Sequence, residues 1–130
     1  MFSSWYAKEP EVFQESKLKE IIFGDNFLTT NVTNMADMFS GLPLEILDLS
    51  NFNTENVTSM YHMFRGCYNL TTLNLCSFNT KKVIDMEGMF SKAPSLTKIY
   101  VGSGWDTGNA IIDNMFDQSA ISSVTTGQCI

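Results

Sequence analysis

One stretch in the first half of the chain decides the fold: Leu44-Glu45-Ile46-Leu47-Asp48-Leu49-Ser50-Asn51-Phe52-Asn53-Thr54-Glu55-Asn56-Val57-Thr58-Ser59-Met60-Tyr61-His62-Met63-Phe64-Arg65-Gly66-Cys67. Its first part has the pattern Leu-x-x-Leu-x-Leu, which is typical of a short strand with one buried face. Its second part has the pattern Val-x-x-Met-x-x-Met-Phe, whose spacing indicates one face of a short helix. We therefore expect one short strand followed by one short helix.

This stretch is one copy of a repeat. Every anchor residue recurs 26 positions later, in the segment from Leu70 to Ala93. The copy before it has the anchors Leu18, Ile21, Phe23, Phe27, Thr29, Val32, Met35, Met38 and Phe39. The copy after it has the anchors Leu96, Ile99, Val101, Trp105, Thr107, Ile112, Met115 and Phe116. Half-units frame the four copies, with Val12-Phe13 at one end and Ile121-x-x-Val124-x-Thr126 at the other.

A unit of this length cannot bury its own apolar side, so its neighbours must cover it. The sequence therefore predicts an α/β repeat fold, a right-handed leucine-rich-repeat solenoid with about five short parallel strands on one face and short helices on the other. We expect a single domain over 1–130. Its parts are an N-terminal cap and half repeat, four repeats and a terminal half repeat, at 1–17, 18–43, 44–69, 70–95, 96–120 and 121–130.

Two further features mark the ends of the expected helices. Thr54, Thr80 and Thr107 follow an Asn or Asp, where an N-cap belongs. Gly41 and Gly66 come two residues after the Met-Phe pair, a position that suits a left-handed helix end.

Composition excludes several classes of protein. The 130 residues carry 8 Lys+Arg against 14 Asp+Glu, a net charge of −6, so a basic surface for nucleic acid or an anionic membrane is not expected. The hydrophobic content of 44% is too high for a disordered chain. No apolar run approaches the roughly 18 residues of a membrane span, and the first residues do not resemble an export leader.

Three cysteines give little sign of a bridge. Cys67 and Cys76 flank a predicted strand, which would separate them by roughly 20 Å, whereas a disulfide needs Cα atoms within about 7 Å. There is no CxxC motif and no Cys/His cluster at zinc spacing. The sequence therefore predicts free thiols, with Cys67 as a small core residue and Cys76 in an exposed loop.

Two rows of equivalent residues run through the repeat. We expect the first row to form an aromatic spine in the core: Phe27, Phe52, Phe78 and Trp105. We expect the second row to be a hydroxyl ladder that caps helices or satisfies backbone groups: Thr29, Thr54, Thr80 and Thr107.

The chain offers little material for catalysis or cofactor binding. Repeated Met-x-x-Met pairs suit Cu(I), but they share a face with Val and Phe and recur once per unit, as a core does: Met35/Met38, Met60/Met63 and Met86/Met89. The single histidine, His62, falls away from the apolar stripe and is predicted to be exposed. No Ser or Thr has a partner base. We therefore expect no catalytic residue, no cofactor and no metal, hence no enzyme.

A partner is expected to bind the outward face of the strands, where side chains at the third and fifth positions of Leu-x-x-Leu-x-Leu form a ladder. The candidate binding residues are Ile22, Ile46, Asp48, Thr72, Asn74, Lys98 and Tyr100; Glu20, Ser123 and Thr125 complete the rows. The apolar members Ile22, Ile46 and Tyr100 are the expected anchors. The thin cover after Thr126 also predicts self-association through the C-terminal end.

The quoted stretch closely resembles the BspA-like leucine-rich repeat of bacterial surface proteins, also described as the DUF285 or mycoplasma-type lipoprotein repeat. The resemblance runs from about Val12 to Thr126. It implies a cell-surface or secreted protein that adheres to host matrix proteins or takes part in bacterial co-aggregation. The chain shows no leader, lipid anchor or wall-sorting signal, so a cytoplasmic location stays open.

Two functions remain open from the sequence. The first is a non-enzymatic interaction or adhesion module that presents its sheet face to a protein or glycan. The second is a structural spacer within a longer array of repeats, with no ligand of its own.

Overall fold

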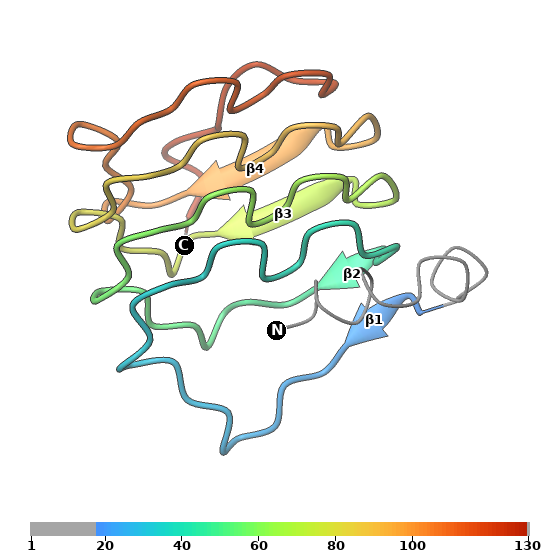
Figure 1. The fold of residues 1–130 in the computed structure, drawn as a ribbon. Coiled ribbons are helices and arrows are strands. Elements are labelled where there is room, and N and C mark those ends of the chain that lie inside the picture. Colours follow the sequence, from blue (N-terminus) through green and yellow to red (C-terminus); the bar gives the residue numbers. More distant parts are fainter. Residues whose placement is uncertain (1–17, 130) are drawn as a thin grey trace.

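The computed structural model describes residues 18–129. The predicted N-terminal cap and half repeat over 1–17 lie outside the described residues. Within residues 18–129 the chain forms four short strands: β1 (Glu20–Ile21), β2 (Ile46–Leu47), β3 (Thr72–Leu75) and β4 (Lys98–Val101). Each strand opens one copy of the repeat, and Figure 1 shows the copies lying one beyond the next.

Strand pairing confirms the repeat length. β1 pairs with β2 in parallel, with Glu20 opposite Ile46. β3 pairs with β4 in parallel, with Thr72 opposite Lys98. Both pairs of opposed residues are 26 positions apart, so equivalent positions of successive units lie side by side.

The predicted fold class is wrong. Residues 18–129 contain no helix, so the expected layer of short helices does not exist. The strands form two separate two-stranded sheets, β1–β2 and β3–β4, instead of one five-stranded sheet. An α/β leucine-rich-repeat solenoid therefore does not describe this chain.

Left-handed backbone conformations explain why the Val-x-x-Met-x-x-Met-Phe segments are not helical. Each unit has a positive φ just before its second Met or equivalent, at Asp37, His62, Gly88 and Asn114, with φ between 53° and 60°. A second positive φ follows two residues after the Phe, at Gly41, Gly66, Lys92 and Gln118. A right-handed helix cannot pass through a left-handed residue, so each segment becomes a series of tight turns. The prediction of left-handed Gly41 and Gly66 is confirmed.

Backbone hydrogen bonds in these segments run between units. The N–H groups of Met60, His62, Phe64 and Gly66 donate to the carbonyls of Asp85, Glu87, Met89 and Ser91 in the next unit, at 2.9–3.0 Å. The residues between them close i to i−3 turns, such as Met63 N–H to the Met60 carbonyl at 3.2 Å. The chain therefore satisfies its backbone through its neighbours rather than within a helix.

The core lies between the strands and the turn segments. It consists of the Leu, Ile, Val, Met and Phe side chains that recur once per unit, and Met60, Met63, Met86 and Met89 are fully buried in it. This placement confirms the expected core position of the Met pairs. Buried apolar surface of this kind supplies the main stabilisation of stacked repeats.

The aromatic stack forms in a different row from the one predicted. Phe39, Phe64, Phe90 and Phe116 of the turn segments stack nearly parallel, with ring centroids 5.7, 5.7 and 5.6 Å apart. In the predicted row, Phe52 and Phe78 are buried. Phe27 and Trp105 at its two ends are only half-buried. The aromatic spine is therefore formed by the Phe of each Met-Phe pair.

Three of the four predicted threonines, Thr29, Thr54 and Thr80, form the ladder, although residues 18–129 contain no helix for it to cap. The Thr54 hydroxyl donates to the Asn79 carbonyl at 2.9 Å and accepts from the Asn79 N–H at 2.8 Å. Thr29 makes the same two bonds to Asn53, and Thr80 makes them to Asp106. Each hydroxyl therefore joins one unit to the backbone of the next.

Candidate binding face

The strands hold five of the seven predicted binding residues, Ile46, Thr72, Asn74, Lys98 and Tyr100, while Ile22 and Asp48 directly follow β1 and β2. Their exposure alternates as expected, because in β3 the side chains of Thr72 and Asn74 are exposed while Leu73 and Leu75 are buried. In β4 Lys98 is exposed and Tyr100 is half-buried. Ile22 and Ile46 are 83% and 55% exposed, which makes them the most accessible apolar side chains of this face.

The structure brings these residues together in two groups rather than in one ladder. Glu20 lies beside Ile46 in the β1–β2 pair, and Asn74 lies beside Tyr100 in the β3–β4 pair. Tyr100 also forms a parallel bridge to Thr125 in the C-terminal tail. The face therefore continues past β4 onto the tail, while the sheets divide between β2 and β3.

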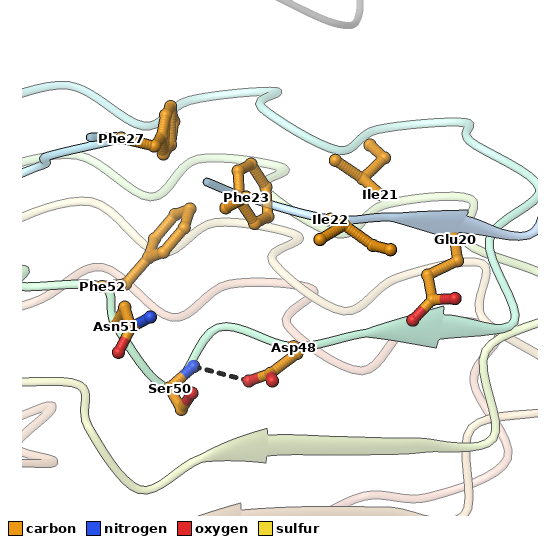
Figure 2. A pocket seen from close by; sticks show the side chains of 9 residues that line it. All are labelled: Glu20, Ile21, Ile22, Phe23, Phe27, Asp48, Ser50, Asn51 and Phe52. Atoms are coloured by element: carbon orange, nitrogen blue, oxygen red, sulfur yellow. Dashed lines mark hydrogen bonds between the residues drawn. The ribbon is translucent and has the colours of Figure 1, made fainter. Parts of the chain in front are cut away.

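A hollow of about 240 Å³ opens at the β1–β2 group (Figure 2). Two predicted residues line it, Ile22 and Asp48, together with Glu20 and the rings of Phe23 and Phe52. The Ser50 N–H donates to the Asp48 carboxylate at 3.0 Å, and this bond lowers the pKa of Asp48 below its usual value. The hollow thus combines apolar walls with a carboxylate that stays charged at neutral pH.

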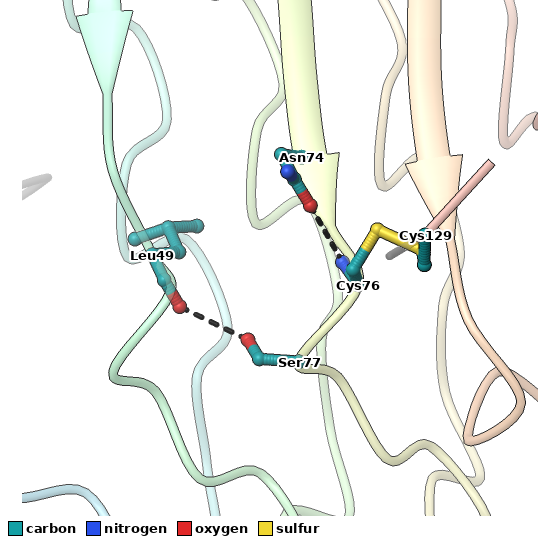
Figure 3. Close-up of a disulfide and its surroundings, with 5 residues drawn as sticks. All are labelled: Leu49, Asn74, Cys76, Ser77 and Cys129. Atoms are coloured by element: carbon teal, nitrogen blue, oxygen red, sulfur yellow. Dashed lines mark hydrogen bonds between the residues drawn. A yellow bond between two sulfur atoms is a disulfide. The ribbon is translucent and has the colours of Figure 1, made fainter.

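A second, shallower hollow of about 350 Å³ lies at the β3–β4 group. Asn74 and Tyr100 line it with Gln128 and a disulfide bridge between Cys76 and Cys129. Figure 3 shows the bridge joining the loop after β3 to the C-terminal tail. The prediction that all thiols are free is therefore wrong for these two cysteines.

Glycine at position 102 gives the bridge room. A side-chain carbon on Gly102 would lie 3.0 Å from the Cys76 carbonyl oxygen and 3.5 Å from the Cys129 sulfur. Since Cys76 and Gly102 are equivalent positions of successive units, the disulfide passes over the small residue of the intervening unit. The tail also bonds to β4 directly, because Val101 N–H donates to the Thr125 carbonyl and Thr125 N–H to the Ile99 carbonyl.

The remaining cysteine is a core residue, as predicted. Cys67 is buried, is not part of a disulfide, and donates its S–H to the Phe39 carbonyl at 3.1 Å. Burial raises the pKa of the Cys67 thiol to about 12. The thiol therefore stays protonated and inert at neutral pH.

His62 is not exposed as predicted. Its ring stacks on Tyr61 with centroids 3.7 Å apart, and its side chain keeps only 23% of its accessible surface. Partial burial, followed by the charge of Arg65, lowers the pKa of His62. Its Nδ1 lies 3.8 Å from the Asp37 carboxylate, and its ring covers Gly88 of the next unit.

Sequence reasoning missed the residues that the tail contributes to the face, Gln128 and Cys129. A signal was present: the terminal half-unit repeats the strand pattern, so Cys129 falls close to the level of Cys76 two units earlier. In the part of the chain that the structure describes, no three His, Cys, Asp or Glu side chains are grouped to hold a metal ion. Residues 18–129 also contain no helix suited to crossing a bilayer.

The geometry defines a class of repeat protein in which backbone hydrogen bonds and a shared core join successive units of about 26 residues. The family model described as "Mycoplasma protein of unknown function, DUF285" matches residues 8–126. The chain therefore belongs to the DUF285 family, which confirms this part of the resemblance seen in its repeat. No curated protein and no solved structure matches the chain.

Proposed function

We propose that the chain is a non-enzymatic interaction module, with a protein partner that binds the strand face around β1 and β2. The observation that carries this proposal is the pairing of two exposed isoleucines, Ile22 and Ile46, with the acidic side chains Glu20 and Asp48 on one face. Exposed apolar side chains beside a hollow are the usual anchors of an interface.

Apolar burial supplies the affinity in this proposal, and charge supplies the selectivity. Covering an exposed isoleucine contributes on the order of 1.5–3 kcal/mol. The carboxylates of Glu20 and Asp48 border the same hollow, and the lowered pKa of Asp48 keeps that group charged. A partner segment with an apolar side chain next to Lys or Arg complements this face best.

The thiol, hydroxyl and thioether side chains that could react or bind a metal stabilise the fold instead, which supports a non-enzymatic role. The Cys67 thiol is buried and protonated. The hydroxyls of Thr29, Thr54 and Thr80 are bonded to backbone groups of the next unit. The methionines of residues 18–129 lie in the core.

We place the module at a cell surface or in a secreted protein. The disulfide between Cys76 and Cys129 supports this location, because such bonds persist in oxidising compartments and are rare in the cytosol. The resemblance to adhesion repeats of bacterial surface proteins points to the same location, and makes host matrix proteins a reasonable first set of partners.

The test measures binding to immobilised extracellular-matrix proteins and to an array of peptides that combine basic and apolar residues, with a glycan array in parallel. The variant Ile22→Lys/Ile46→Lys places positive charge on the proposed face. The matched control is Ile84→Lys, since Ile84 is 61% exposed in a turn segment away from that face. We expect the double variant to lose protein binding and the control to keep it.

Other outcomes contradict the proposal. Equal binding by the double variant and the control removes the β1–β2 face as the site. Binding to glycans alone changes the class of ligand and directs attention to the hollow at Asn74 and Tyr100. Absence of binding to every probe supports the spacer function instead.

A further inference from the structure

Most backbone hydrogen bonds between aligned turn segments run from the earlier unit to the later one. One bond at each junction runs the other way, from the N–H groups of Thr58, Ile84 and Ile111 to the carbonyls of Thr33, Thr58 and Ile84. Four N–H groups of one unit donate to four carbonyls of the next, and the pattern holds at three successive junctions. The donors are Met35, Asp37, Phe39 and Gly41 at the first junction, Met60, His62, Phe64 and Gly66 at the second, and Met86, Gly88, Phe90 and Lys92 at the third. The two ends of the row of units therefore differ in polarity.

Within residues 18–129, the turn segment of the last unit presents four equivalent N–H groups that no later turn segment covers. In the described part of the chain, the N–H groups of Ile112, Asn114, Phe116 and Gln118 donate no backbone hydrogen bond. Ile111 and Ile112 beside them are 53% and 48% exposed. This end is thus a donor edge with an apolar border.

The first unit presents the complementary edge. Within residues 18–129, the equivalent carbonyls of Asn34, Ala36, Met38 and Ser40 accept no hydrogen bond. Beside them lies a hollow of about 230 Å³ whose lining includes Val32, Met35 and Leu28, and Leu28 is 77% exposed. This end is thus an acceptor edge with an apolar recess.

The threonine ladder is open at the same two ends. Thr107 is the last member of the row and is half-exposed, and no described residue bonds to its hydroxyl. Leu28 is equivalent to Asn53, Asn79 and Asp106 of later units. The backbone C=O of each of these residues accepts a hydrogen bond from a threonine hydroxyl, and its N–H donates one to the same hydroxyl. The backbone groups of Leu28 have no such partner in the described chain.

We propose that a second copy of the chain docks its first unit on the turn segment of the last unit, head to tail. The N–H groups of Ile112, Asn114, Phe116 and Gln118 meet the carbonyls of Asn34, Ala36, Met38 and Ser40. The Thr107 hydroxyl meets Leu28, and Ile112 enters the recess beside Leu28. Two like edges cannot pair in this way, because donors would face donors.

The contact is confined to the turn half of the unit. The strand half beyond β4 is already covered by the tail, which bonds to Ile99 and Val101 and is fixed by the Cys76–Cys129 bridge. A contact of this size is small, so association is weak and appears only at high concentration. Because the contact is heterologous, it produces open chains rather than closed dimers.

The test uses sedimentation velocity over concentrations up to about 1 mM. Ile112→Lys blocks the donor edge, Leu28→Lys blocks the acceptor edge, and Ile46→Lys serves as the control on the strand face. We expect the wild type and the control to form a series of oligomers, and each edge variant to associate roughly tenfold more weakly or not at all. Circular dichroism and the thermal midpoint verify that each variant is folded.

Mixing the two edge variants tests the polarity. Leu28→Lys keeps its donor edge and Ile112→Lys keeps its acceptor edge, so their mixture should form a 1:1 dimer that neither forms alone. Wild-type protein that stays monomeric throughout overturns the proposal. So does association that is lost in Ile46→Lys but kept in both edge variants, an outcome that leaves the function proposed for the strand face to be judged on its own test.

Discussion

The hydroxyl of Thr54 lies between the two backbone groups of Asn79, 2.9 Å from its carbonyl oxygen and 2.8 Å from its nitrogen. One buried side chain thus replaces the pair of backbone bonds that a strand would make at this level. The arrangement recurs for Thr29 and Thr80, so the position is a regular joint between units.

Replacing Thr54 with Val should destabilise the protein by about 1–3 kcal/mol, since the shape is kept while both Asn79 backbone groups lose their partner. Urea unfolding measures the difference in the free energy of unfolding. Thr107→Val is the matched control, because Thr107 is half-exposed and makes no comparable bonds within residues 18–129. We expect it to change stability by less than about 0.5 kcal/mol. Equal effects at the two positions would show that the ladder does not stabilise the fold.

Cys67 makes the free energy of unfolding depend on pH in the alkaline range. Below pH 9 both the folded and the unfolded thiol are protonated, so the residue contributes no pH dependence. Above pH 9 the unfolded thiol ionises, whereas the folded thiol, with its pKa raised to about 12, stays neutral. Stability should therefore fall between pH 9 and 12, with a slope of up to about 1.4 kcal/mol per pH unit.

The control for this prediction is Cys67→Ala, which copies the residue found at Ala93 in the next unit. Unfolding of this variant by urea between pH 8 and 11 should lack the slope that Cys67 adds. If both proteins show the same dependence on pH, other groups account for it.

The repeat, its length and its buried face could all be read from the sequence, because apolar side chains recur at fixed positions. The conformation of the turn segments could not be read from apolar spacing alone, since Met60, Met63 and Phe64 fit a helix equally well. The deciding residues lie between them. Asp37, His62, Gly88 and Asn114 occupy one left-handed position, and three of these residue types tolerate that conformation better than most while glycine adopts it freely.

The outward position of Thr72, Asn74 and Lys98 could be predicted from the sequence, but the extension of this face onto the C-terminal tail could not. Alternation along β3 and β4 placed Thr72, Asn74 and Lys98 outside. The contribution of the tail depends on Cys129, whose partner Cys76 is 53 residues away. Two cysteines so far apart in sequence are brought together by the stacking of units. The spacing of residues within one unit does not reveal this pairing.

Reducing the Cys76–Cys129 bridge should lower the free energy of unfolding by about 2–4 kcal/mol, because the bridge closes a long loop in the unfolded chain. Urea unfolding with and without dithiothreitol measures this difference. The double variant Cys76→Ser/Cys129→Ser should not respond to the reductant. A wild-type protein that is equally stable in both conditions would show that the bridge does not form.

Gly88 and His62 should be energetically coupled. Gly88 has a φ of +60°, and a side-chain carbon there would lie 2.5 Å from Cδ2 of the His62 ring, which is held in place by its stacking on Tyr61. Gly88→Ala therefore combines two costs, the left-handed backbone at about 1–2 kcal/mol and a displaced imidazole at about 1–3 kcal/mol.

A double-mutant cycle separates the two costs. In the His62→Ala background the ring is absent, so Gly88→Ala should retain only the backbone cost. The coupling between the two substitutions should be about 1 kcal/mol or more in the free energy of unfolding, measured in urea. Additive effects would mean that the imidazole moves aside freely, which its stacking on Tyr61 argues against.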